Sequence, residues 1–237
     1  MKFFRAISIL ITVILFSVSA YSQESNPEKC GTFTMHQEKM NSDPDYALEY
    51  EEKMSKIDTW LKNRDESKMD CDEILYLPVA VHYQDVTIDM ACAIDMAVDQ
   101  VRILNEDFGA TNADVQKFLD AQPTTWPGIS NKASCIQFCL ATLNHPAGSG
   151  ITEGDYAVTL NDYGEVDNIP EWSGYLNLFV RNMNGGILGY SPLGGSVAAG
   201  QAVVMNTFAF GSGAGCPGFT PDSTYGLGRT VTHELGH

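Results

Sequence analysis

The residue types and spacing that best suit catalysis lie at the end of the chain. His233, Glu234 and His237 form an H-E-x-x-H pattern. On a helix, positions i and i+4 lie on one face, so the two imidazoles can bind one zinc ion. Glu234 then lies beside the ion, where it can take a proton from a water molecule. The pattern predicts His233 and His237 as zinc ligands and Glu234 as the catalytic residue.

A catalytic zinc needs three protein ligands and an open position for water. The sequence ends at His237, so we expect the third ligand to lie beyond it and this chain to be an inactive, C-terminally truncated fragment. Such a fragment should bind zinc weakly or not at all, unless Cys30 is a ligand. Two alternatives remain: a zinc enzyme whose third ligand is a downstream glutamate, and a non-catalytic secreted binding protein with the same fold. The presence of Glu234 argues against the second.

The residues before the pattern indicate a helix. Leu227, Val231 and Leu235 are four apart, which predicts a buried stripe on a helix that begins near Tyr225.

Residues 1–22 are predicted to be a signal peptide. Lys2 and Arg5 precede an apolar run from Ala6 to Val18, and small residues follow it. This run is short for a membrane span, and no other segment is apolar enough to be one. We therefore expect a secreted, extracellular protein with no membrane partner, in which some of the six cysteines are paired.

The composition excludes one class of partner. The chain has 30 acidic and 14 basic residues, with a formal net charge of -16 at pH 7. Because no basic patch is available to neutralise phosphates, we expect no nucleic-acid partner. The acidic residues between Asp155 and Asp167 lack EF-hand spacing, so calcium binding stays open with no ligand assigned.

Residues 23–70 differ from the rest of the chain and are predicted to be a largely helical pro-segment. They are rich in charged residues, and Tyr46–Leu61 has the pattern of an amphipathic helix. The alternative is an ordinary N-terminal helical extension.

Residues 71–237 show strand and helix patterns of an α/β (α+β) domain. A helix is predicted from Ile94 to Phe108, with Thr87 as its N-cap and Gly109 at its end. Strands are predicted at 74–83, 135–141, 175–181, 187–191 and 202–206, with a long loop over 141–175. Strand, helix and further strands in this order predict a mostly parallel twisted sheet with packed helices. The first strand should be buried on both faces, because its apolar run is nearly continuous.

Several of these segments resemble the pappalysin-type metzincins, which are secreted zinc endopeptidases. The similar segments are 77–82, 100–108, 111–114, 176–180, 185–190, 203–206 and the final stretch 227–237. The resemblance implies a metzincin-like twisted mixed sheet and an incomplete catalytic domain over 71–237. It also implies a zinc cofactor, a Glu234 general base, and a protein or peptide substrate that lies extended along residues 187–191.

Cys30-Gly31-Thr32 resembles the Cys-Gly-Thr of pro-peptides in the same family. This resemblance implies that the Cys30 thiolate is an inhibitory zinc ligand in the zymogen. The alternatives are that Cys30 is in a disulfide or has no role.

The other cysteines suggest disulfides. Cys135 and Cys139 should not pair with each other, because four residues of strand separate their Cα atoms by about 13 Å. Cys71 is the expected partner of Cys135, since both lie at the starting ends of neighbouring parallel strands. Cys216 is expected to pair with a residue beyond the chain.

Three histidines outside the pattern carry no predicted function. His82 is expected in the core or at the end of the sheet, whereas His36 and His145 are expected to be solvated.

Overall fold

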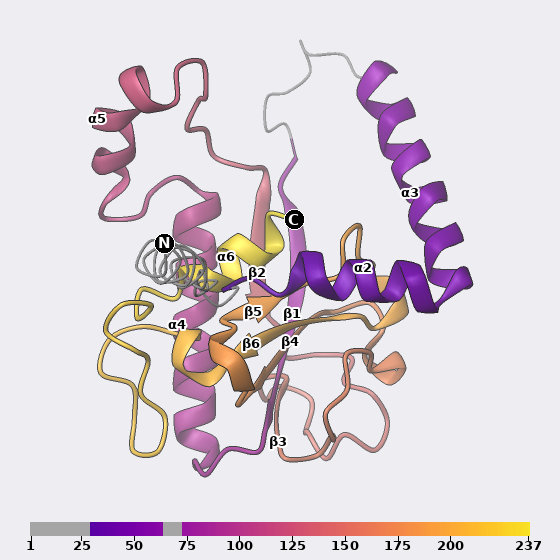
Figure 1. Cartoon of the computed structure of the whole chain (residues 1–237). Helices are drawn as coiled ribbons and strands as arrows, with labels where there is room; N and C mark the ends of the chain where they lie inside the picture. Colours follow the sequence, from indigo (N-terminus) through magenta and orange to yellow (C-terminus); the bar gives the residue numbers. More distant parts are fainter. Residues whose placement is uncertain (1–28, 64–72) are drawn as a thin grey trace, which may run out of the picture.

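A mixed sheet forms the centre of the molecule (Figure 1). The computed structural model describes residues 29–63 and 73–237, so the predicted signal peptide lies outside the described residues. The strands are β1 (Leu75–Gln84), β2 (Ile136–Leu140), β3 (Val158–Leu160), β4 (Leu176–Arg181), β5 (Gly189–Tyr190) and β6 (Ala202–Asn206). They follow the order β2-β1-β4-β6-β5, and β3 pairs with β1 next to β2.

Every strand pairing in this sheet is parallel except that of β5 with β6, which is antiparallel. The predicted α/β fold with a mixed sheet and packed helices is therefore confirmed. β5 is the last strand in this order, so only one of its edges pairs with another strand of the sheet and the other can pair with an extended segment.

The helices are α2 (Thr32–Ser42), α3 (Pro44–Asn63), α4 (Met90–Phe108), α5 (Val115–Thr125) and α6 (Arg229–Leu235). Figure 1 shows α4 along one side of the sheet, α6 near the end of the chain, and α3 extending away from the sheet. None of the helices in the described part of the chain is long and apolar enough to cross a bilayer.

Successive side chains along β1 pack into two different hydrophobic cores, one on each face of the sheet. Val79 and Val81 of β1 belong to the core on the α4 side, whereas Ala80 between them belongs to the core that contains Trp172 and Phe179. Successive side chains of a strand point to opposite faces, so a strand covered on both faces needs apolar residues throughout. The first half of β1 does not meet this condition, because Leu75 and Tyr76 are exposed. The prediction of burial on both faces holds only from Val79 onward.

Helix α4 crosses from β1 to β2 and ends at Gly109, as predicted. Its N-cap is Asp89 and not Thr87, since the Asp89 side chain accepts a hydrogen bond from the Cys92 amide at 2.8 Å. The prediction of Thr87 was wrong, because Ile88 and Asp89 still lie between Thr87 and Met90, the first residue of the helix.

Helix α6 begins at Arg229, later than the predicted Tyr225. Gly228 has φ +68°, and a Cβ there would meet Ile103 Cδ1 at 2.4 Å. This left-handed residue separates Leu227 from the helix, and Leu227 is 59% exposed. The predicted stripe is therefore buried at Val231 and partly buried at Leu235, but it does not include Leu227.

One disulfide joins Cys92 of α4 to Cys216, with the Cα atoms 6.0 Å apart. The expectation that Cys216 pairs beyond the chain was wrong, because α4 and the segment before α6 meet in space. Closing a loop of 124 residues stabilises the fold by about 5 kcal/mol in the chain-entropy view.

The other cysteines follow the predictions as far as the structure describes them. Cys139 has a free, exposed thiol, so it does not pair with Cys135. Cys135 is disulfide-bonded, and Cys71, its predicted partner, lies outside the described residues.

The burial of the three histidines outside the H-E-x-x-H pattern differs in part from the prediction. His36 is buried and its Nδ1 lies 2.9 Å from the Tyr46 hydroxyl, so the expectation of a solvated side chain was wrong. His145 is half-buried, with Nε2 3.0 Å from the Asp155 carbonyl oxygen. His82 lies in the core as predicted, between Thr159 Oγ1 at 3.0 Å and Asn177 Oδ1 at 3.1 Å.

Burial of His82 should make the fold acid-sensitive. Desolvation lowers the pKa of His82 from 6.5 to about 4, so the folded state holds it neutral while the unfolded state protonates it. Its contribution to stability is complete above pH 6.5 and is lost as the pH falls toward 4, with a total of about 3 kcal/mol. Urea unfolding at pH 7.5 and pH 4.5 should show a smaller pH-dependent loss for His82→Gln than for the wild type. Equal losses in both proteins would contradict this assignment.

Candidate metal centre

The predicted zinc ligands lie at the C-terminal end of α6, with His233 on its last turn and His237 two residues beyond its last residue. The ring centroids of His233 and His237 are 4.9 Å apart, and both side chains are accessible. Glu234 is only 1% exposed, and its Oε2 lies 3.8 Å from His237 Nε2. The helix therefore presents two imidazoles to one point and places a buried carboxylate beside them.

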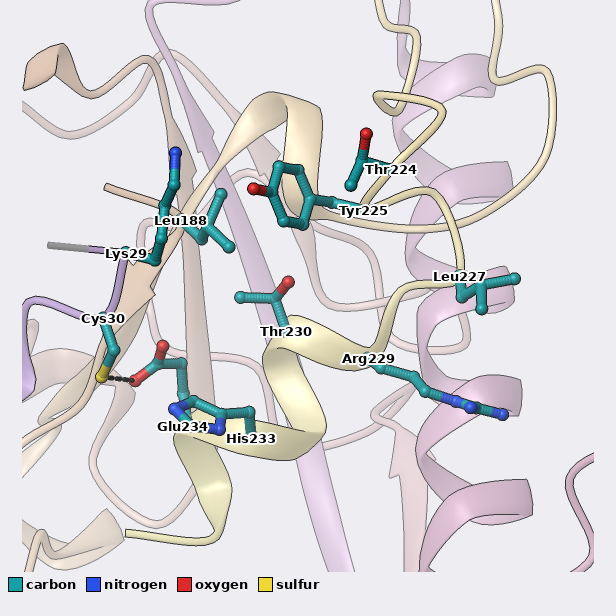
Figure 2. Close-up of a pocket in the computed structure, with 10 residues that line it drawn as sticks. All are labelled: Lys29, Cys30, Leu188, Thr224, Tyr225, Leu227, Arg229, Thr230, His233 and Glu234. Atoms are coloured by element: carbon teal, nitrogen blue, oxygen red, sulfur yellow. Dashed lines mark hydrogen bonds between the residues drawn. The ribbon is translucent and has the colours of Figure 1, made fainter. Parts of the chain in front are cut away.

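Cys30 reaches the same point from the other end of the chain. Its Sγ lies 3.2 Å from His237 Nε2 and donates to Glu234 Oε2 at 3.6 Å. Figure 2 shows the Cys30 and Glu234 side chains pointing toward each other. The ligand atoms of these three residues and of His233 all lie within 4.8 Å of one another. The four residues that the sequence selected are thus brought together.

The donor set and its spacing fit zinc. One thiolate and two imidazoles are ligands that zinc prefers, and a sulfur and a nitrogen on a tetrahedral zinc lie about 3.5 Å apart. The separation of Cys30 Sγ and His237 Nε2 is 3.2 Å. Glu234 Oε1 is buried and has no hydrogen-bond partner, which leaves one carboxylate oxygen available to a group bound at this point.

Burial dominates the electrostatics of the site. Desolvation raises the pKa of Glu234, against the opposing effects of the Thr32 hydrogen bond and the two histidines. Desolvation likewise raises the pKa of the Cys30 thiol. A bound cation would reverse both effects, because it favours the thiolate and the carboxylate.

The segment that carries Cys30 pairs with the edge strand β5. The Gly31 amide donates to the Gly189 carbonyl at 2.9 Å, and the Leu188 amide donates to the Lys29 carbonyl at 2.8 Å. Cys30 and Gly189 form a parallel bridge. The site therefore holds an extended segment of its own chain by backbone hydrogen bonds along this edge.

Gly189 permits a close approach between β5 and α6. A Cβ at this position would lie 3.0 Å from Val204 O and 3.1 Å from Glu234 Cγ. Both contacts are tighter than ordinary packing, so a side chain here would displace either the strand or the carboxylate.

Side chains of α4 hold α6 in place. Gln100 is fully buried, donates to the Gly228 carbonyl at 2.9 Å and accepts from the Gly211 amide at 2.8 Å. Asp107 accepts a hydrogen bond from Thr232 Oγ1 at 2.7 Å and also pairs with Arg229. The start of α6 and its first turn are thereby fixed to α4.

An apolar cavity of about 360 Å³ lies beside the site. Leu188, Tyr225 and Thr230 line it together with Lys29, and its floor reaches His233 and Glu234 (Figure 2).

Sequence reasoning missed some residues that shape the site. Thr32 is 2% exposed and contacts Glu234, and only its place in the Cys-Gly-Thr motif could have indicated this. Gln100 and Asp107 lie on the predicted helix, but nothing in the sequence indicates that they face α6. Ser191, whose hydroxyl donates to the Glu234 carbonyl at 2.7 Å, has no distinguishing signal.

The fold is similar to that of solved structures that include promirolysin and mirolysin, which are metzincin-type metalloproteases. The promirolysin structure has a pro-segment. A Tannerella forsythia promirolysin mutant superposes with a TM-score of 0.57 at 23% identity, over 89% of this chain and 68% of that chain.

Two mirolysin structures are also similar. Tannerella forsythia mature mirolysin with a cleaved peptide gives a TM-score of 0.49 at 25% identity, and mirolysin in complex with a compound gives 0.48 at 26%. Each alignment covers 70% of this chain and 63% of that chain, so this chain spans less than two thirds of their length. No protein-family model matches the sequence, and no curated protein matches it significantly.

The Gln100 bridge gives a testable prediction. Gln100→Leu removes both hydrogen bonds and leaves two buried backbone groups unpaired, so it should destabilise the fold by about 2–4 kcal/mol. Gln116 is exposed on α5, and Gln116→Leu should change stability by less than about 0.5 kcal/mol. Urea unfolding of the two variants measures the difference. Similar midpoints would show that the bridge does not fix α6.

Proposed function

We propose that this chain is part of the precursor of a secreted zinc-dependent endopeptidase. Residues 1–22 are the signal peptide, residues 23–70 the pro-segment, and residues 71–237 the N-terminal part of the catalytic domain. His233 and His237 bind zinc, Glu234 is the general base, and Cys30 is a zinc ligand in the latent form.

One observation carries the proposal: the convergence of Cys30 with His233, Glu234 and His237. Cys30 is 207 residues from His237 along the chain, yet its sulfur lies 3.2 Å from the His237 imidazole. A free thiol beside two imidazoles and a buried carboxylate is a metal-binding combination, and the metalloprotease precursor fold supports the same conclusion.

The chemistry follows from the position of Glu234. Zinc supplies Lewis acidity, which lowers the pKa of water and polarises a peptide carbonyl. The Glu234 carboxylate accepts a proton from the attacking water and returns it to the leaving amine. Glu234 Oε2 accepts hydrogen bonds from Thr32 and Cys30, so this oxygen becomes available to a substrate only when the pro-segment leaves.

The pairing at β5 indicates the substrate class. The Leu188 amide and the Gly189 carbonyl bind the backbone of residues 29–31 and not their side chains. Any extended polypeptide can make such hydrogen bonds. We infer that protein or peptide substrates bind along this edge after the pro-segment has been removed. The strong negative charge makes nucleic acid an unsuitable partner.

Zinc binding tests the ligand assignment. Competition with a chromophoric chelator should show one zinc ion per chain, and Cys30→Ala or His233→Ala should weaken its binding at least tenfold, because each removes one of three donors. Among the described residues the other free thiol is that of Cys139, which is exposed on β2 at the opposite end of the strand order from β5, and Cys139→Ala should leave the affinity unchanged. An unchanged affinity in Cys30→Ala would remove Cys30 from the ligand set.

Substitution of Glu234 tests the reaction. In the complete precursor after activation, Glu234→Gln should retain zinc but lower peptidase turnover by about 10²–10⁴-fold, the usual contribution of a general base. Glu171 is exposed and outside the site, so Glu171→Gln should retain full turnover. Cleavage of a denatured protein substrate measures both. Near-normal turnover by Glu234→Gln would overturn the assignment.

A further inference from the structure

Thr32 makes two hydrogen bonds within the candidate site. Its hydroxyl donates to Glu234 Oε2 at 3.0 Å and accepts from the Ser191 amide at 2.9 Å. The residue is only 2% exposed, and Glu234 and Ser191 are buried as well. The hydroxyl therefore joins α6 to the chain that directly follows β5.

These two contacts use groups that a working site needs. Glu234 Oε2 already accepts from the Cys30 thiol, so Thr32 completes the occupation of the carboxylate oxygen nearest to His237. Ser191 directly follows Tyr190, the last residue of β5, and its amide is a donor next to the edge that receives an extended chain. Thr32 thus occupies one carboxylate oxygen of Glu234 and a neighbouring backbone donor at the same time.

The Thr32 contacts need no metal ion. The Cys30 thiol is a weak donor and lies 3.6 Å from Glu234 Oε2, whereas the Thr32 hydroxyl makes hydrogen bonds of 3.0 Å and 2.9 Å to protein groups. Thr32 is also the first residue of α2, and α2 is fixed to α3 by the contact of His36 with Tyr46. The Thr32 hydroxyl is therefore held by its own hydrogen bonds to Glu234 and Ser191 and by the attachment of α2 to α3.

We infer that Thr32 is a second inhibitory contact of the precursor besides Cys30, and we call it the Thr32 latch. It withholds Glu234 Oε2 and the Ser191 amide from substrate whether or not Cys30 binds a metal ion. This inference rests on the proposed role of Glu234. It goes beyond the Cys30 switch because the closed site then depends on two separate contacts.

Hydrogen exchange of this chain without metal tests the latch. The Gly31 and Leu188 amides pair the pro-segment with β5, so their exchange reports its release. Thr32→Val keeps the shape but loses both hydrogen bonds, and should raise exchange at these amides at least tenfold, or about 1.4 kcal/mol. Thr32→Ser keeps the hydroxyl and should stay within about threefold of the wild type.

Two controls separate release from unfolding. Thr59 lies on the exposed part of α3, and Thr59→Val should leave the exchange of both amides unchanged. The β4 amides report the core, and Thr32→Val should not affect them. The inference would be overturned if Thr32→Val raised exchange at the Gly31 and Leu188 amides less than twofold, or if it raised exchange at the β4 amides equally.

The zinc-loaded complete precursor gives a second readout. Cys30→Ala should shorten the lag before self-processing, and addition of Thr32→Val should shorten it further. Equal lags in Cys30→Ala and the double variant would overturn the Thr32 latch. If no variant shows peptidase activity while Thr32→Val still accelerates Gly31 exchange, the proposed function fails and the Thr32 contact remains.

Discussion

The attachment of α6 to α4 is the constraint on which the site depends. Gln100 reaches from α4 to the Gly228 carbonyl at the start of α6, and Asp107 holds Thr232 one turn later. With these contacts made, Val231 is fully buried and Glu234 faces β5 across Gly189. The helix has only 7 residues, too few to be stable alone, so tertiary contacts must set its position.

The site joins the two ends of the described chain. Residues 29–32 lie between β5 and α6, where the backbone pairs with the strand and the Cys30 and Thr32 side chains reach Glu234. One short segment thus contacts the edge of the sheet, the proposed zinc ligand His237 and the Glu234 carboxylate. The closed arrangement is consistent with a latent precursor whose activation requires removal of this segment.

Much of this arrangement could be predicted from sequence because it rests on local pattern. The H-E-x-x-H spacing fixes which side chains share a helix face, and the apolar runs of β4 and β6 reflect burial on both faces. Contacts between distant segments could not be predicted in this way. Helix α5 has no buried residues and β3 has only three residues, so neither leaves a clear pattern. The Cys92–Cys216 disulfide and the Thr32 contacts depend on how segments meet in space.

Zinc-edge X-ray absorption of the zinc-loaded precursor tests the central claim most directly, that Cys30, His233 and His237 bind one metal ion. The account predicts one sulfur neighbour at about 2.3 Å and imidazole nitrogens at about 2.0–2.1 Å, with the sulfur signal lost in Cys30→Ala. A precursor whose zinc has only nitrogen and oxygen neighbours would contradict it.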